Sequence, residues 1–238
     1  NGLTITADHD LDLAGTINAS ASLIAKTGAI TQSGGSWNSG VFGAASAAGD
    51  ITLLQGNRFG TFNAQSSGGG TIRLNNANSA ALNLGLTTSG SAAVTTAGAL
   101  SSSGITVDSL SASANAIDLT SNVNVNRFTG LAAAGGDIRV TVAHGFTIEG
   151  DVTASKATGK IIDLWANGGA ITQTTGTISA YGVTLRATGN VTQASDGKVD
   201  ANATTLGGAN LYLTGANRFG LGTATAIDSA GTVQLRGD

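Results

Sequence analysis

Apolar and polar residues alternate along most of the chain in short runs. Examples are Ile72-Arg73-Leu74, Ile138-Arg139-Val140 and Ile162-Asp163-Leu164. A period of two places successive side chains on opposite faces of a strand, so these runs are typical of β-strands with one buried face. Apolar residues at helical spacing are hard to find anywhere in the sequence. The pattern therefore predicts an all-β protein in which Ile138 and Leu164 point inward and Arg139 points outward.

The predicted strands recur at a nearly constant interval of about 21 residues. One class of inward residues comprises Leu11, Ile30, Ile51, Ile72, Val94, Ile117, Ile138, Ile162, Val183, Leu211 and Val233. A second class, half a period out of phase, comprises Leu82, Ile105, Val125, Phe146, Ile171, Val191 and Phe219. A fixed step is expected where each period makes one circuit and stacks on the last, with parallel strands about 4.8 Å apart. The chain is thus predicted to be a parallel β-helix (β-solenoid) of about 11 circuits of about 21 residues.

Residues 1–238 are interpreted as a single β-helix segment, because no stretch reads as a linker. The step from Val183 to Leu211 is 28 residues, which is too long for one circuit. An outward loop is therefore predicted near 195–208, and a smaller one near 153–160.

Two short phrases alternate along the chain. The first occurs as Asn57-Arg58-Phe59-Gly60, Asn126-Arg127-Phe128-Thr129 and Asn217-Arg218-Phe219-Gly220. The second occurs as 28–32 (GAITQ), 169–173 (GAITQ) and 189–193 (GNVTQ). Recurrence of this kind indicates a repeat architecture. The three arginines lie three and four circuits apart, so we interpret the first phrase as a repeated corner whose phenylalanine caps the core, and not as one anion site.

The alternation of these phrases with strands such as 134–141 (AGGDIRVT) and 229–235 (SAGTVQL) resembles the repeat region of filamentous-haemagglutinin-like exoproteins. These are large bacterial adhesins exported by two-partner secretion, and the resemblance covers essentially the whole chain. It implies a right-handed parallel β-helix on the outer surface of a Gram-negative cell, together with an outer-membrane secretion partner. The secretion domain of that family carries an Asn-Pro motif. Because this chain has no proline, the resemblance places it in the shaft.

Composition narrows the function classes. Charged residues make up 11% of the 238 residues, Gly numbers 36, and the formal net charge is -3. Small side chains suit a narrow core, and the lack of clustered Lys and Arg argues against nucleic acid and anionic lipid as partners. No apolar run approaches the ~20 residues of a spanning helix, so no membrane insertion is predicted. Absence of cysteine excludes disulfides and thiolate chemistry. The first residue is Asn1, in mid-pattern, so we expect a segment of a longer protein.

Residues with catalytic or metal-binding chemistry are sparse. The one dense acidic group is 8–12 (Asp-His-Asp-Leu-Asp), at the amino end of the chain. We expect no basic partner near it. His144 precedes Gly145 at a predicted corner and has no neighbouring nucleophile, so we interpret it as a turn residue. Asp50, Asp137 and Asp151 lack the tandem Gly-rich spacing of calcium-binding repeats. No catalytic residue, metal site or cofactor is predicted.

Three aromatic residues are the candidates for contact with a ligand or partner. They are Trp165, Tyr181 and Trp37. Alternation around Trp165 puts its ring outward, where it would stack on a sugar or a neighbouring protein. The alternative is that Trp165 covers the loop near 153–160.

The sequence therefore favours a non-catalytic shaft segment of a secreted bacterial surface adhesin or fibre, acting in attachment or in biofilm matrix assembly. Surface glycans, host or matrix proteins and further copies of the chain, joined end to end, are the candidate partners. One alternative is a self-assembling extracellular filament or surface-layer subunit. Another is a carbohydrate-active β-helix enzyme, which would need acidic and basic residues gathered in a groove over adjacent circuits.

Overall fold

The computed structural model describes residues 2–219 and 226–237. Gly220 of the third Asn-Arg-Phe phrase and Asp238 lie outside these ranges. The described residues form β-strands and no helix. Among them there is accordingly no helix long and apolar enough to cross a membrane. The chain divides into two compact units, residues 1–114 and 115–238. The interpretation of residues 1–238 as a single β-helix segment stays a prediction.

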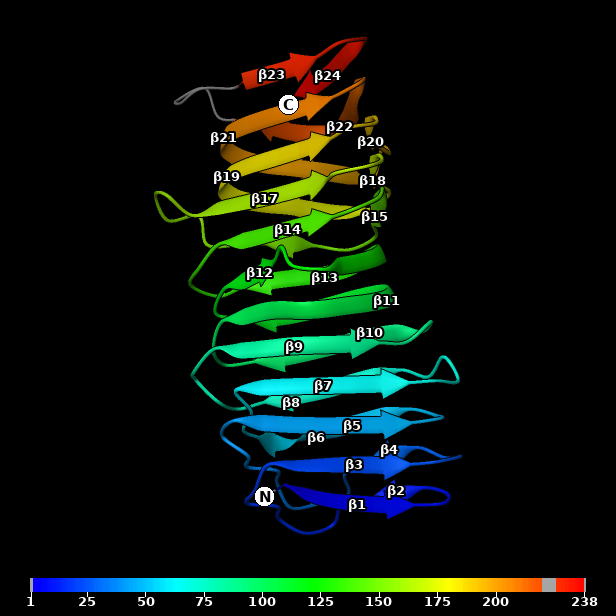
Figure 1. Cartoon of the computed structure of the whole chain (residues 1–238). Helices are drawn as coiled ribbons and strands as arrows, with labels where there is room; N and C mark the ends of the chain where they lie inside the picture. The colour runs from blue at the N-terminus through cyan, green and yellow to red at the C-terminus, as the bar shows by residue number, and fades with distance from the viewer. Residues whose placement is uncertain (1, 220–225, 238) are drawn as a thin grey trace. The chain divides into compact units, whose positions relative to one another are not determined.

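Unit 1 contains eleven strands within its described residues (Figure 1). They are β1 (Leu3–Ala7), β2 (Leu11–Asp12), β3 (Ala21–Ala25), β4 (Ile30–Thr31), β5 (Phe42–Ala47), β6 (Ile51–Asn57), β7 (Thr61–Ser66), β8 (Ile72–Asn76), β9 (Leu82–Thr87), β10 (Ser91–Thr96) and β11 (Leu100–Ala114). One face of the unit is built from β1, β3, β5, β7, β9 and the first half of β11, all parallel. A second face is built from β2, β4, β6, β8, β10 and the second half of β11.

Unit 2 contains thirteen strands in its described part. They are β12 (Ile117–Leu119), β13 (Val123–Ala133), β14 (Ile138–Val142), β15 (Phe146–Ile148), β16 (Val152–Thr153), β17 (Ile161–Ala166), β18 (Ile171–Gln173), β19 (Gly176–Ala187), β20 (Val191–Gln193), β21 (Gly197–Gly208), β22 (Leu211–Phe219), β23 (Ala226–Ser229) and β24 (Val233–Gly237). Long strands such as β19 and β21 turn a corner, so their two halves belong to different faces.

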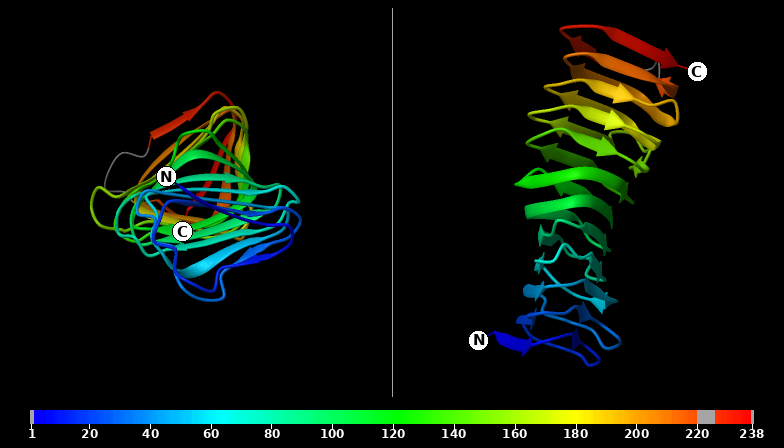
Figure 2. Two further views of the ribbon diagram at one scale, coloured as in Figure 1. Left: turned by 60° about the horizontal axis from the view of Figure 1, so that its bottom comes forward. Right: turned by 90° about the vertical axis from the view of Figure 1, so that its right-hand side faces the viewer.

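Three runs of parallel strands make up unit 2. The first contains β12, β14, β17, the ends of β19 and β21, and β23. The second contains β15, β18, β20, β22 and β24. The third contains the end of β13, β16 and the beginnings of β19 and β21. Within each unit, strands of successive circuits lie one over another (Figure 2).

The predicted fold class is confirmed, because the chain is an all-β, parallel β-solenoid of about 11 circuits spaced by about 21 residues. Register accounts for this spacing. Ile30 pairs with Ile51, Ile51 with Ile72, and Ile138 with Ile162, so like side chains fall in columns. Each of these isoleucines is fully buried. In each unit the columns form a narrow core, in which each circuit covers the apolar residues of its neighbour.

The outward loop predicted near 195–208 is wrong. Residues 197–208 are β21, which pairs with β19 along its length. Val183 pairs with Thr204, and Leu211 belongs to another run, in which it pairs with Val191. The strand was missed because the inward position at 204 is a threonine, so the apolar column is interrupted there. A similar error occurred in unit 1, where Val94 was predicted to follow Ile72 in one column. Ile72 pairs instead with Ala92, a small residue that the apolar pattern did not single out.

The outward loop predicted near 153–160 is present over residues 154–160, between β16 and β17. Figure 1 shows it projecting beside β17. Its turn is closed by the backbone of Lys160 donating to Ala157 O at 3.1 Å. Gly159 has φ +83°, a conformation that L side chains rarely adopt. The extra residues lengthen the step from Ile138 to Ile162 without disturbing the strand register.

Aromatic side chains pack against one another in the core of each unit. In unit 1, the ring of Trp37 meets Phe59 edge to face at 5.1 Å between centroids, and Phe59 lies 4.7 Å from Phe62. In unit 2, Phe128 meets Phe146 edge to face at 5.2 Å. Edge-to-face pairs of this kind add to the burial of apolar area. The core-capping role predicted for phenylalanine holds at Phe59 and Phe128, which are buried.

Candidate functional site

Trp37 is not a ligand contact. Its relative exposure is 0%, and its indole nitrogen donates to Ala19 O at 3.1 Å. The prediction that it contacts a ligand or partner is wrong for the folded chain. The reason is that its stretch, 33–39 (Ser-Gly-Gly-Ser-Trp-Asn-Ser), has no apolar alternation from which an inward position can be read.

Trp165 points outward from β17, as predicted, and is half-buried. It pairs with Thr141 on β14 and with Arg186 on β19. The Arg186 guanidinium lies 5.0 Å from the ring centroid, and it also donates to both carboxylate oxygens of Asp163 at 3.1 and 2.9 Å. Both hydrogen bonds come from one nitrogen, Nη2. The cation over the ring and its ion pair with Asp163 form a cluster that occupies one face of the indole. The described contact of Trp165 is thus with Arg186 of the next circuit.

Tyr181 lies at the corner of β19 and is half-buried. Ala180 pairs with Ala201 and Gly182 pairs with Ala203 on β21. Tyr181 stands between these two pairs, where β19 changes from one face to the next. A ring at such a corner is accessible from the side of the coil. Its role as a contact residue stays a prediction.

Charged side chains on unit 2 pair with one another within a circuit or across circuits. Arg139 contacts Asp137 at 3.1 Å, and Arg127 contacts Glu149 at 3.6 Å. Arg218 donates to Asp200 at 2.6 Å, and Lys156 of the outward loop bonds the other oxygen of the same carboxylate. Two of the three arginines of the recurring phrase are therefore used in local ion pairs, while Arg58 is exposed. These contacts fit a repeated corner better than one shared anion site.

Asp200 fastens the outward loop to β21, and its pKa reflects this. Burial would raise the pKa of Asp200, but the hydrogen bonds and charges of Lys156 and Arg218 outweigh burial, so the pKa falls below its ordinary value of 3.8. A carboxylate whose pKa is lowered by folding stabilises the fold above its unfolded pKa, and that stabilisation is lost as pH falls through the folded pKa.

We therefore expect Asp200→Asn to lower stability at pH 7 by roughly 1 kcal/mol, because both cations are partly solvent-exposed. The difference between variant and parent should shrink as pH falls below about 4. Urea midpoints measured from pH 7 to pH 2 would show this, with Asp196→Asn, an exposed neighbour, as the control. A stability difference that persists unchanged at pH 2 contradicts the assigned ion pairs.

The acidic group at 8–12 is built into the turns of unit 1. Asp8 pairs with Lys26 at 2.7 Å, so the expectation that this group has no basic partner is wrong, because the partner comes from the next circuit. Asp10 accepts the backbone N–H of Ala29 at 2.8 Å. Asp12 accepts from the hydroxyl and the backbone N–H of Ser33, and the Ser33 hydroxyl is the main cause that lowers the pKa of Asp12. Carboxylates held in this way tie one circuit to the next. Over residues 2–219 and 226–237, no group of three or more His, Cys, Asp or Glu is arranged to hold a metal ion.

His144 lies in a hollow of about 430 Å³ on unit 2, which is also lined by Asn122, Asn124, Thr141 and Asn167. Its Nε2 is hydrogen-bonded to the Asn124 side chain, and its Nδ1 lies 2.6 Å from Gly145 O. The hollow has no carboxylate, cation or nucleophilic thiol among its lining residues. These contacts are those of a turn residue, which agrees with the interpretation from sequence.

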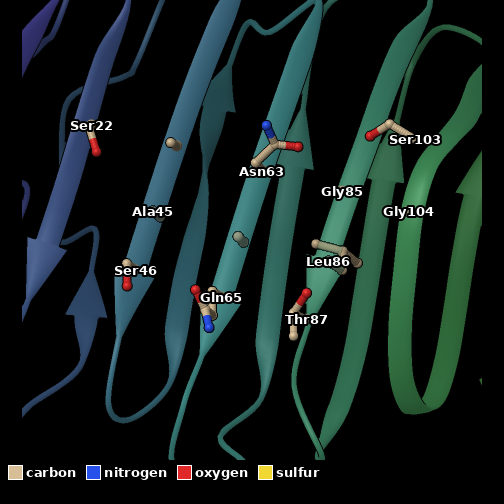
Figure 3. Close-up of a pocket in the computed structure, with 12 residues that line it drawn as sticks. Ser22, Ala45, Ser46, Asn63, Gln65, Gly85, Leu86, Thr87, Ser103 and Gly104 are labelled. Atoms are coloured by element: carbon tan, nitrogen blue, oxygen red, sulfur yellow. The ribbon is translucent and has the colours of Figure 1, made fainter.

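A second hollow, of about 410 Å³, opens on the first face of unit 1 (Figure 3). Its floor lies at Ala44, Gly85 and Gly104, whose side chains are a methyl group or absent. These three residues share an outward column with Asn63, which stands between Ala44 and Gly85. Ser22, Ser46, Asn63, Gln65, Thr87 and Ser103 border it. This groove was not predicted from the sequence, because it is formed by small residues that become neighbours only once the register is known. We refer to it below as the neutral groove.

Comparison with protein families gives one result. A family model described as repeats of unknown function (DUF5649) matches residues 1–65 and 69–135, which is more than half of the chain. Neither the curated proteins nor the solved structures provide a match.

Proposed function

We propose that this chain, which belongs to the family of repeats of unknown function (DUF5649), is a non-catalytic shaft segment of a secreted bacterial surface adhesin or fibre. In this role it spaces and presents binding regions in attachment or in a biofilm matrix. The observation that carries the proposal is the in-register stacking of nearly equivalent circuits. Such a body is lengthened by adding circuits, and it needs no single central site.

Two further features support the proposal. The chain contains no cysteine, so no disulfide forms before or during export. On unit 2, acids and bases meet in local pairs and in one group of three, Lys156, Asp200 and Arg218. A depolymerising enzyme would instead concentrate such groups along one groove. From the resemblance of the repeats to those of filamentous-haemagglutinin-like exoproteins, we expect an outer-membrane secretion partner and a location on the surface of a Gram-negative cell.

Location on intact cells tests the proposal directly. We expect antibodies raised against this chain to label the outside of unpermeabilised cells of the source organism, and added protease to remove the label without lysis. Deletion of residues 1–238 from the gene should reduce attachment to surfaces. Confinement of the chain to the cell interior would overturn the proposal.

Absence of turnover is the corresponding biochemical prediction. Incubation with pectin, alginate and neutral glycans should release no unsaturated or reducing ends. Asp10→Asn and His144→Ala should leave this result unchanged, because both side chains are engaged in turns. Reproducible cleavage that either substitution abolishes would favour the enzyme alternative.

A filament subunit is the second candidate, and the terminal strands favour it. Ile227, Val233 and Leu235 continue inward columns from Leu206, Leu211 and Leu213, but their relative exposures are 45%, 42% and 37%. At the other end, Leu3 is 45% exposed. Among the described residues, β1, β23 and β24 each pair with one neighbouring strand. Each therefore has an unpaired edge beside exposed apolar side chains, and such edges recruit further strands.

We therefore predict end-to-end association of the isolated chain, a heterologous contact that does not close on itself. Light scattering across a dilution series should show a mass that rises with concentration. Leu235→Lys, which places a charge on the uncovered column, should reduce the association, whereas Gln234→Lys on the outward side should not. A strictly monomeric particle at tens of micromolar contradicts the prediction.

A further inference from the structure

The first face of unit 1 has no charged residue in its strands. β1, β3, β5, β7, β9 and residues 100–106 of β11 contain no Asp, Glu, Lys or Arg. Other faces of the molecule do carry charged residues. The second face of unit 1 has Asp12, Arg73 and Asp108, and the first run of unit 2 has Arg139 and Asp163. Soluble surfaces usually mix charges of both signs. Six adjacent neutral strand segments thus distinguish this face.

Polar groups at the neutral groove have no partner within the described protein. Neither Asn63 nor Gln65 forms a hydrogen bond to another described residue through its side chain, and both are exposed. Figure 3 shows these two amides on β7, with Ser46 on β5 and Thr87 on β9 to either side. Amides both donate and accept, and so do hydroxyls. The groove therefore offers paired donors and acceptors without net charge.

An exposed aromatic ring stands on the same face. Phe42, on β5, is 38% exposed and points outward two residues before Ala44 of the groove floor. It pairs with Thr61 of β7, two residues before Asn63. Its flat face can stack on the apolar side of a sugar ring.

We propose that the neutral groove binds an uncharged glycan chain that lies across the strands β3 to β11. Parallel strands repeat about every 4.8 Å, so the groove offers similar groups at intervals comparable to the length of one sugar unit. Amides and hydroxyls recognise sugar hydroxyls, and the absence of cations disfavours acidic glycans. An added β-strand is disfavoured because the backbones of β3, β5 and β7 are already paired on both sides.

Side-chain volume at the floor explains why the groove is open. A Cβ added at Gly104 would meet nothing within 4 Å, so the space above this residue is free. At Gly85 the same atom would come within 2.3 Å of the Asn63 amide oxygen, so glycine there lets the Asn63 side chain lie over the floor. Gly104→Tyr therefore fills the groove without a clash at Cβ, and it supplies a variant that blocks the site.

The test is binding of defined hexasaccharides to the purified chain by calorimetry. The probes are cellohexaose, mannohexaose and xylohexaose, with hexagalacturonate as the acidic comparator. We expect at least one neutral probe to bind in preference to hexagalacturonate. Asn63→Ala/Gln65→Ala, Phe42→Ala and Gly104→Tyr should each weaken that binding by about tenfold or more, as expected for the loss of one or two hydrogen bonds or a stacked ring.

The matched control is Thr95→Ala/Ser113→Ala, which removes two paired outward polar side chains from the second face of the same unit. It should bind as the parent does, and circular dichroism should confirm that every variant folds. The inference is overturned by no binding of any neutral probe, by binding that the groove variants leave unchanged, or by a dimer that these variants dissociate. The inference deepens the proposed function by naming a ligand class. Because it is read from binding alone, its failure leaves the cell-surface location to be judged separately.

Discussion

Replacement of Ile138 by aspartate should be among the most damaging single changes in unit 2. Ile138 is fully buried and stands in a column between Ile117 and Ile162. An aspartate there would bury a carboxylate against apolar side chains with no cation or donor in the column. We expect a loss well above ~3 kcal/mol, because a buried unpaired charge is penalised more than a cavity.

The neighbouring outward position provides the control. Arg139 pairs in register with Asp118 and Asp163 and contacts Asp137. Arg139→Asp would add a further carboxylate to this acidic column, so Arg139→Gln is the better comparison, and it should cost no more than about 1 kcal/mol. Thermal and urea unfolding of the two variants measures the difference. Equal destabilisation by both would show that the assigned inward and outward faces are wrong.

Alternation of apolar and polar residues was sufficient to predict strands, parallel stacking and the circuit length. It failed where an inward position carries a small or polar residue. Thr204 is 1% exposed in the core, and its hydroxyl has no hydrogen-bond partner among the described residues. From sequence, such a threonine is indistinguishable from an outward one. The strand that contains it was therefore predicted as a loop.

Candidate contact residues were harder to predict than strands. The outward position of Trp165 followed from its strand, whereas Trp37 lies in a Gly- and Ser-rich stretch with no periodicity and is buried beside Phe59 and Phe62. The neutral groove depends on which small residues stand side by side on five strands. A one-residue error of register moves every side chain to the other face, so the groove is visible only in the folded chain.

The two recurring phrases have a structural meaning that their spacing alone did not reveal. In unit 1 the glutamine of one phrase, Gln32, and the asparagine of the other, Asn57, exchange two hydrogen bonds, each 3.0 Å long. In unit 2, Gln193 and Asn217 do the same at 2.9 and 2.8 Å. Both asparagines have 0% relative exposure. The burial of the glutamines could have been predicted from the sequence. Gln32 and Gln193 each stand two residues after an inward apolar residue, Ile30 or Val191, and so at an inward position themselves.

Asn57 satisfies several buried groups at once. Its amide oxygen accepts from Gln32 and from the backbone N–H of Trp37 at 2.8 Å, and its amide nitrogen donates to Gln32 and to Leu53 O at 3.1 Å. Leucine has a similar volume but replaces none of these bonds. An unsatisfied buried polar group costs about 1–3 kcal/mol, so Asn57→Leu should lower stability by about 3 kcal/mol or more.

Asn126 is the matched control, because it is the asparagine of the same phrase but its side chain is exposed. Asn126→Leu should shift the urea midpoint far less than Asn57→Leu does, and Asn217→Leu should resemble Asn57→Leu. Removal of both members of the pair, in Gln32→Leu/Asn57→Leu, should cost less than the sum of the two single changes, because each single change leaves the other amide unpaired. Additive losses would show that the two amides are not coupled. Equal midpoints for the variants at 57 and 126 would mean that the phrase recurs for a reason other than this buried pair.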